Sequence, residues 1–188
     1  MFMTEQNYQG YLLASHPKRQ ESALHKSVVL ILEHGPTGAT GLQLNKSYVS
    51  EITLATVMQN VGLHSSFDQP LYNGGPEAKT RIHVVHSLDW YSPTTVRVSE
   101  NIGVSNDVSV LAAISENVGP EYYRVIAGFT RWLPGHLEGE MVGEDPWDIS
   151  HTWSYVPSEV DTLFELDNIE QWHRVIAESG RMQVSSWF

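Results

Sequence analysis

Hydrophobic positions along the chain form short continuous runs in some segments and helical spacings in others. Residues 28–32 read Val-Val-Leu-Ile-Leu and are followed by a turn-forming stretch at residues 34–38 that contains two glycines and a proline. A branched, continuous run of this kind is typical of a strand buried on both faces. Residues 41–44 supply a returning arm, so this part of the sequence predicts a β-hairpin.

Helical spacing is clearest where Leu54, Val57, Met58 and Val61 fall on one face. The expected helices are this one, ended by Gly62, a second at residues 107–116 capped by Ser105 or Asn106, one capped by Ser158, and a last one ended by Gly180. Further strands are expected at residues 70–73, 81–86, 94–98 and 122–129. This mixed order predicts an α+β fold.

No internal repeat, low-complexity tract or linker divides the sequence. Residues 1–188 are therefore expected to form a single domain. A chain of this length is large enough to bury a hydrophobic core. The apolar runs fall far short of the roughly 18 residues that a membrane helix needs, and no secretion leader is recognised. These features predict a cytoplasmic protein.

The composition is acidic, with 11 Lys and Arg against 22 Asp and Glu and a formal net charge of -11. Such a balance disfavours a surface that neutralises nucleic-acid phosphates, so direct DNA binding is not expected. Cysteine is absent. This excludes disulfides, thiolate metal sites and cysteine nucleophiles.

Carboxylates concentrate in residues 132–173, which hold ten of them, four tryptophans and no Lys or Arg. An acidic surface with aromatic side chains suits a basic protein partner, a cationic ligand or a metal ion. A solvated acidic face with its tryptophans in the core is the alternative interpretation.

Two short motifs could contribute to a binding site. Asn45 and Lys46 end a predicted strand, where the amide can satisfy backbone groups and the lysine can meet either an anion or solvent. Gly74 and Gly75 are adjacent and followed by proline. Paired glycines allow the close backbone approach that a ligand pocket uses and that a tight turn uses equally.

The sequence contains nine histidines, which are common metal ligands, so a metal site is one possible function. His136 and Glu140 would share a face if residues 135–141 are helical, and a third ligand could come from a distant residue such as His34 or His151. This spacing defines an alternative function, a metal-assisted hydrolase that uses His34, His136 and Glu140 with Glu138 as general base.

Several ordered blocks together resemble the YqgE/AlgH family of bacterial proteins, over about residues 10–180. The blocks are Gly10-Tyr11-Leu12-Leu13-Ala14, residues 27–34 leading through 38–41 to Leu44-Asn45-Lys46, Tyr72-Asn73-Gly74-Gly75-Pro76, and Trp132 with Gly135, Leu137, Glu138, Glu140 and Trp147. The chain departs from the usual family pattern at Ser47, Arg131 and His136, where the family has proline, glycine and glutamine.

The resemblance implies an α+β domain with a bifurcated, mostly antiparallel sheet that curls into a partial barrel with flanking helices. It also implies a cytosolic protein, and some members of the family are called transcriptional regulators. This sequence has neither a helix-turn-helix signature nor a basic stripe, so any regulation is expected to be indirect.

The leading hypothesis is therefore a non-enzymatic binding protein that acts through a protein partner or a small anionic ligand and needs no cofactor. The candidate ligand-binding residues are Glu33, His34, Asn45, Lys46, Gly74, Gly75, Trp132, Glu138 and Glu140. Lys46 and the backbone donors of the two glycines would hold an anionic group, while Trp132 would supply apolar contact.

Overall fold

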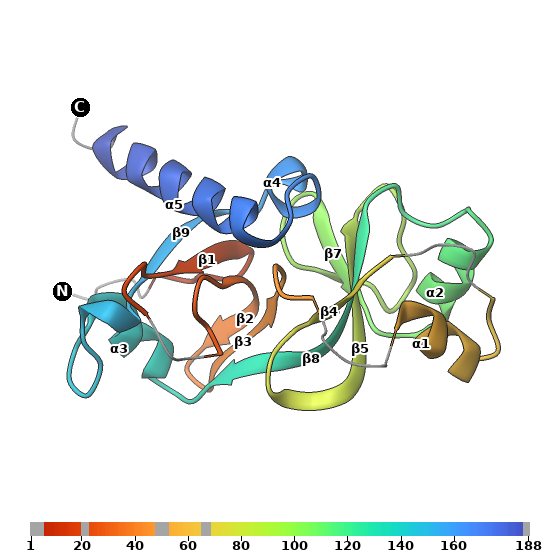
Figure 1. Ribbon diagram of the computed structural model, residues 1–188, viewed down its shortest axis with the longest axis horizontal. Helices are drawn as coiled ribbons and strands as arrows, with labels where there is room; N and C mark the ends of the chain where they lie inside the picture. The colour runs from red at the N-terminus through yellow and green to blue at the C-terminus, as the bar shows by residue number, and fades with distance from the viewer. Residues whose placement is uncertain (1–5, 20–22, 48–52, 65–68, 186–188) are drawn as a thin grey trace.

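A computed structural model describes residues 6–19, 23–47, 53–64 and 69–185 (Figure 1). The strands are β1 (Tyr11–Ser15), β2 (Val28–Gly35), β3 (Gly38–Gln43), β4 (Leu71–Asn73), β5 (Glu77–Ser87), β6 (Val96–Arg97), β7 (Ile102–Ser105), β8 (Tyr123–Trp132) and β9 (Trp153–Pro157). The helices are α1 (Leu54–Asn60), α2 (Val108–Ser115), α3 (His136–Val142), a 3-10 turn η1 (Ile149–His151), α4 (Val160–Phe164) and α5 (Asn168–Ser185).

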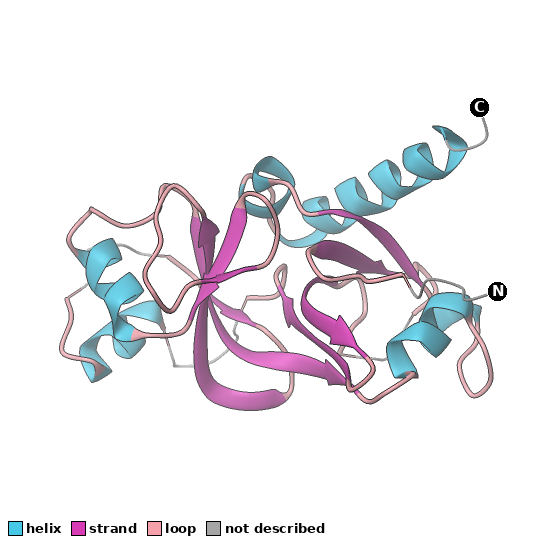
Figure 2. Ribbon diagram, turned by 180° about the vertical axis from the view of Figure 1, so that it is seen from behind, coloured by secondary structure: helices cyan, strands magenta, loops and turns pink. Residues whose placement is uncertain are grey.

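The strands of the described residues form one curled sheet in the order β6-β7-β5-β8-β3-β2-β1-β9. Every neighbouring pair along this path is antiparallel, whereas β4 lies parallel to β8 outside it. Helices α1 and α2 cover one end of the molecule, and α3 and α5 lie at the other (Figure 2). The predicted α+β fold with a curled, mostly antiparallel sheet and flanking helices is confirmed.

The sheet divides in two at β8. The first half of this strand pairs with β4 and β5, and its last residues pair with β3. The change falls at Gly128, whose φ of 80° is in the left-handed region that side chains other than glycine rarely adopt. Opposite this point residues 78–81 of β5 leave the ladder, because the register moves from Glu77 to Ile82. Such bulges aim side chains in new directions.

The first and last strands of the chain lie side by side. All five residues of β1 pair with β9, from Tyr11 opposite Pro157 to Ser15 opposite Trp153. Helix α5 then packs across this end of the sheet, where the indole Nε1 of Trp172 donates a 2.9 Å hydrogen bond to the Ser15 carbonyl. Strand β9 and helix α5, which come from the end of the chain, therefore pack against the N-terminal strands β1 and β2.

The core consists of three clusters of buried side chains, two of them on opposite faces of the β1–β3 part of the sheet and one beneath α1 and α2. Leu12, Leu30 and Leu42 face α5, while Leu13 and Ile31 face α3 and Trp132, as expected for strands buried on both faces. The third cluster packs α1 and α2 against β4, β5 and β8. The continuous apolar run of residues 28–32 therefore serves two clusters at once.

Three predicted helix boundaries are wrong. Asp107, not Ser105 or Asn106, caps α2, because its Oδ1 accepts a 2.7 Å hydrogen bond from the Ser109 amide. Ser158 does not cap α4, since its hydroxyl donates to Ser99 Oγ and the cap position falls on Glu159. Gly180 does not end α5, which continues to Ser185.

Candidate functional site

A surface pocket of about 620 Å³ lies where the end of β3, the β4–β5 turn, the end of β8 and α3 meet. Four cations line it, namely Arg19, Lys46, Lys79 and Arg131, and we call it the basic pocket. The other residues that line it and enter the argument are Gly75, Thr130, Trp132, Leu133, His136 and Glu140. The predicted site residues Lys46, Gly75, Trp132 and Glu140 thus lie together.

Lys46 is positioned by its neighbour Asn45. The Asn45 side chain is 2% exposed, and its Oδ1 accepts a 2.8 Å hydrogen bond from the Val28 amide. Its Nδ2 donates to the carbonyls of Lys26 and Asn168. Asn45 is therefore engaged entirely within the chain and holds the backbone from which Lys46 extends, instead of contacting a ligand.

The glycine pair makes a close strand contact. The amide of Gly74 donates to the Ala127 carbonyl at 2.9 Å, and the amide of Gly75 donates to Asn73 Oδ1 at 3.1 Å. At Gly75, where φ is 143°, a Cβ atom would lie 2.4 Å from the Phe129 carbonyl oxygen. Both backbone donors are thus occupied within the chain, so the expectation that these two amides hold an anion is not met by the folded structure.

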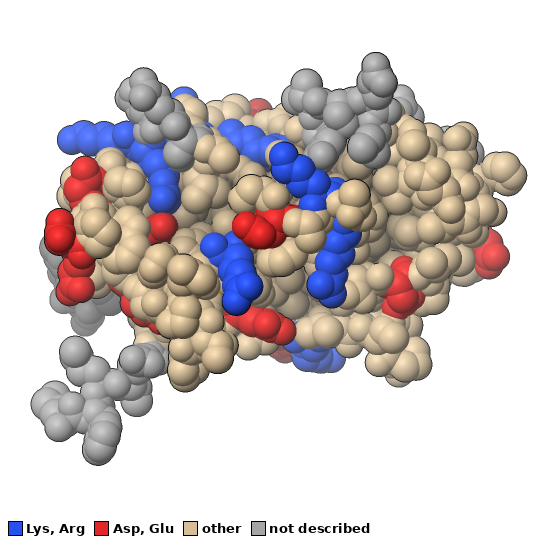
Figure 3. Space-filling view, turned by 90° about the horizontal axis from the view of Figure 1, so that it is seen from below, with Lys and Arg blue, Asp and Glu red and all other residues tan. Residues whose placement is uncertain are grey.

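Positive charge gathers here although the chain as a whole is strongly acidic. The pocket takes four of the 11 Lys and Arg side chains, and Glu140 is the carboxylate among its described lining residues. Lys and Arg side chains lie over the central part of the lower face of the molecule, with a few acidic ones between them (Figure 3). Lys46, Lys79 and Arg131 form no ion pair within the part of the chain that the structure describes.

Glu140 neutralises one of the four cations. Its Oε2 lies 3.3 Å from Arg19 Nη2 and accepts a 2.7 Å hydrogen bond from the indole Nε1 of Trp153. The Arg19 guanidinium also stacks 4.8 Å from the centre of the Trp153 ring. Arg19 and Glu140 are 7% and 8% exposed, so this is a buried ion pair in the lining of the pocket.

Lys46 is half-buried, and its protonated form is less stable than that of a lysine side chain in water. Burial lowers the pKa of the Lys46 ammonium, and the positive charge of Lys26 lowers it further. A bound anion would offset both effects, because opposite charge favours the protonated amine.

His34 and Glu138 lie elsewhere, behind the tip of the β2–β3 hairpin. The Tyr8 amide donates to His34 Nδ1 at 3.2 Å, and His34 Nε2 lies 3.1 Å from Glu138 Oε1. Because Nδ1 accepts, the ring proton of a neutral His34 sits on Nε2 and points to the carboxylate. Glu33 extends from the same hairpin and lines two cavities, one between the hairpin and strands β5 to β7, and a more open one that it shares with His34, Arg131 and Trp132.

The metal-assisted hydrolase is not supported. Its four residues do not form one cluster, since Glu140 pairs with Arg19, His34 pairs with Glu138, and His136 packs against Trp147 with ring centres 5.2 Å apart. Within the described ranges no group of three or more His, Asp or Glu side chains is arranged to hold a metal ion.

Eight of the ten carboxylates in residues 132–173 are exposed, in keeping with a solvated acidic surface, but three of the ten are engaged by described side chains distant in sequence. Glu140 is buried, Glu138 is bound to a histidine, and Asp167 pairs with Arg124 at 2.9 Å. Trp132, Trp153 and Trp172 are 4 to 6% exposed and belong to the core. The interpretation of the tryptophans as core residues holds for these three, whereas Trp147 is only partly buried.

Three cations of the pocket could not be assigned to a site from the sequence alone. Arg19, Lys79 and Arg131 stand in unrelated segments, and only the sheet topology brings them to Lys46. Lys79 lies in the β5 bulge opposite Gly128 and reaches the pocket from there. Arg131 stands where the family usually has glycine, which is the one local hint that this position differs.

The cavity between the β2–β3 hairpin and strands β5 to β7, which we call the second cavity, contains a buried histidine, His83, whose pKa is unusually low. His83 is 7% exposed, and burial, together with the charge of Arg81, lowers its pKa from 6.5 to about 4. Below pH 6.5 the unfolded chain therefore takes up a proton that the folded chain does not, so stability falls as the pH drops from 6.5 towards 4. Burial also lowers the pKa of His86.

We expect the free energy of unfolding to fall by about 2 kcal/mol more in the natural protein than in His83→Gln between about pH 7 and pH 4.5. Urea unfolding at the two pH values measures this difference. His136→Gln, at an exposed histidine, is the matched control and should follow the natural protein. Equal acid sensitivity of the natural protein and His83→Gln would show that His83 is not buried in its neutral form.

The fold and the pocket together define a class of protein, an α+β domain whose curled sheet carries a cation-lined pocket at one edge. A family model described as AlgH-like matches residues 12–183, so the chain belongs to the AlgH-like family. This confirms the resemblance seen in the sequence.

Relatives cover nearly the whole chain. A UPF0301 protein of Sphingopyxis alaskensis is 32% identical over 175 residues, which are 92% of this chain and 89% of the relative. The solution structure of the AlgH protein from Pseudomonas aeruginosa superposes with a TM-score of 0.72 at 26% identity and covers 97% of this chain and 92% of that one. A crystal structure from Corynebacterium diphtheriae, at 22% identity and a TM-score of 0.67 over 93% and 88% of the two chains, shares the fold.

None of the helices in the described part of the chain combines the length and the apolar character needed to cross a membrane.

Proposed function

We propose that this protein is a non-enzymatic binding protein that takes a small anion into the basic pocket. The observation that carries the proposal is the convergence of four cations from four separate segments in a chain of net charge -11. Of these four, Glu140 neutralises only Arg19, and the other three cations are costly to hold together without an opposite charge, since like charges repel.

The pocket suits a compact polyanion, such as one with phosphate or carboxylate groups. Its volume of about 620 Å³ falls in the range of small-molecule sites, roughly 300 to 1,000 Å³. Lys46, Lys79 and Arg131 are the free cations, and arginine can bind such groups with two parallel hydrogen bonds. Leu133, which is 53% exposed, and the edge of Trp132 offer apolar contact to the rest of the ligand.

The anion would act as a signal or a metabolite to be sensed, and the effect on gene expression or metabolism would pass through a protein partner in the cytoplasm. This follows from the family, some of whose members are called transcriptional regulators, and from the acidic balance, which opposes direct contact with DNA. A gel-shift experiment at low salt should therefore find no DNA binding.

The experiment is a calorimetric titration with inorganic pyrophosphate and with citrate at low ionic strength. We expect Lys46→Ala to weaken the binding of the better of the two about tenfold without changing the fold, because a hydrogen bond to a charged group contributes about 1.5 kcal/mol. Lys79→Ala and Arg131→Ala should have similar effects. Added salt should weaken binding in the natural protein.

Arg181→Ala is the matched control, since Arg181 is an exposed arginine near the end of α5 and outside the pocket. It should bind as the natural protein does. The proposal fails if neither anion binds at millimolar concentration, or if Lys46→Ala and Arg131→Ala bind as tightly as Arg181→Ala.

A further inference from the structure

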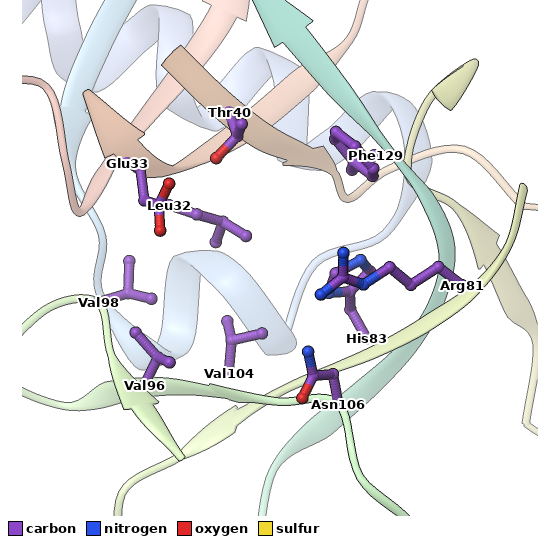
Figure 4. Close-up of a pocket in the computed structure, with 10 residues that line it drawn as sticks. All are labelled: Leu32, Glu33, Thr40, Arg81, His83, Val96, Val98, Val104, Asn106 and Phe129. Atoms are coloured by element: carbon purple, nitrogen blue, oxygen red, sulfur yellow. The ribbon is translucent and has the colours of Figure 1, made fainter. Parts of the chain in front are cut away.

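The second cavity, of about 270 Å³, lies between the two halves of the sheet and separate from the basic pocket. One wall comes from the β2–β3 hairpin and β8, and the other comes from β5, β6 and β7 (Figure 4). The bulge at residues 78–81 serves both sites, because Lys79 lines the basic pocket and Arg81 lines this cavity.

Apolar side chains form the middle of the cavity. Val98 and Val104 are 6% and 7% exposed, and Leu32 and Phe129 face them from the opposite wall (Figure 4). Val96 lies beside them on β6 and is 56% exposed. A ligand in the cavity would cover this valine and gain the free energy of removing apolar surface from water.

Opposite charges stand at the two sides of this apolar middle. Glu33 extends from the hairpin, and Arg81 extends from β5 on the other wall (Figure 4). Both side chains are exposed, and neither forms an ion pair with another residue of the described ranges. The cavity therefore presents one free anionic group and one free cationic group.

His83 adds an unsatisfied polar group next to Arg81. Its Nε2 is buried and has no hydrogen-bond partner among the described residues, although the rest of the ring packs edge-on against Phe129 at 6.2 Å. A buried polar atom without a partner costs free energy that a bound group can recover. The nearby positive charge of Arg81 further disfavours protonation, so this histidine is a neutral donor or acceptor at neutral pH.

We propose that this cavity binds a small zwitterion whose cationic and anionic ends are separated by an apolar segment. The cationic end pairs with Glu33, and the anionic end pairs with Arg81. His83 Nε2 is buried in the free protein, so binding requires a neighbouring side chain to move aside, after which Nε2 donates a hydrogen bond to the same anionic end. The apolar segment lies along Val96, Val98 and Val104. This site is independent of the anion in the basic pocket.

The experiment titrates 6-aminohexanoate into the protein, followed by calorimetry and by the ring nitrogen signals of the histidines in NMR. Hexanoate and hexylamine each lack one charge, and leucine carries both charges on one carbon. We expect 6-aminohexanoate to shift the signals of His83 and to bind about tenfold more tightly than any of the three comparison compounds. The His83 signals are assigned from their absence in His83→Gln.

Two variants test the charged ends separately. Glu33→Gln should reduce the preference for 6-aminohexanoate over hexanoate about tenfold, and Arg81→Gln should reduce the preference over hexylamine by a similar factor. Arg97→Gln is the matched control, because Arg97 lies on β6 outside the cavity and contacts the Glu100 carbonyl. It should retain both preferences.

The proposal is overturned if 6-aminohexanoate leaves the His83 signals unchanged at millimolar concentration. Equal binding of hexanoate would show an anion site at Arg81 without a role for Glu33, and tighter binding of leucine would show that the two charges belong close together. Either result contradicts the proposed ligand class. Pyrophosphate binding in the basic pocket is read from separate variants, so the two proposals can fail independently.

Discussion

Replacing Glu140 with alanine is expected to lower the free energy of unfolding by about 3 to 5 kcal/mol. The change leaves the Arg19 guanidinium buried without its counter-ion and the Trp153 indole without its acceptor. Breaking a buried ion pair from one side costs this much because the remaining charge stays out of water. Urea unfolding followed by tryptophan fluorescence measures the loss.

Glu144→Ala is the control for this change, since Glu144 follows the same helix but is exposed and forms no ion pair with the described residues. Its effect should stay within about 0.5 kcal/mol. Glu140→Gln should fall between the two, because an amide oxygen can still accept from Trp153. A Glu140→Ala protein as stable as Glu144→Ala would mean that Arg19 and Glu140 are not paired in solution.

Replacing Arg124 with methionine should cost a similar amount, about 3 to 5 kcal/mol. Arg124 is 3% exposed in β8 and joins three parts of the chain, since Nη1 donates to the Leu44 carbonyl at 3.0 Å and Nη2 lies 2.9 Å from Asp167 Oδ1. Nη1 also donates to Gln171 Oε1 on α5. Methionine fills much of the space but leaves these acceptors without a donor.

Two further variants separate the causes. Asp167→Asn removes the charge from the exposed end of the cluster, and its cost should remain below about 1 kcal/mol because that side chain is 61% exposed. Arg131→Met changes an exposed arginine on the same strand and should be close to neutral. If Arg124→Met is no worse than Arg131→Met, the interior hydrogen bonds of Arg124 do not stabilise the fold.

Local patterns predicted most of the elements, but they missed the strands β1, β7 and β9 and gave no pairing between distant strands. The branched run at residues 28–32 predicted the hairpin because a strand buried on both faces needs apolar side chains on both. Nothing in residues 153–157 signals a strand that pairs with β1, since their hydrophobic pattern is short and the partner is far away in sequence. Gly180 failed as a helix stop because α5 is exposed there and a glycine in such a position costs only about 1 kcal/mol.

The same distinction holds for the candidate site. Lys46 and the Asn73-Gly75 turn were found because each ends a strand, and the Asn73 amide donates to the Lys46 carbonyl at 2.7 Å, so they lie together. Asn45 was placed among the ligand-binding residues because an asparagine at a strand end serves backbone and ligand equally well in a sequence. The choice depends on partners at Val28 and Asn168, which only the folded chain brings within reach.

The pairing of β1 with β9 also affects how the protein is made. A ribosome releases the hairpin early, yet the outer edge of β1 gains its partner only when residues 153–157 have emerged. Until then the nascent chain presents an unpaired strand of apolar residues, of the kind that associates with other chains. For most of the time that the chain is growing, the outer edge of β1 therefore has no partner strand within its own chain.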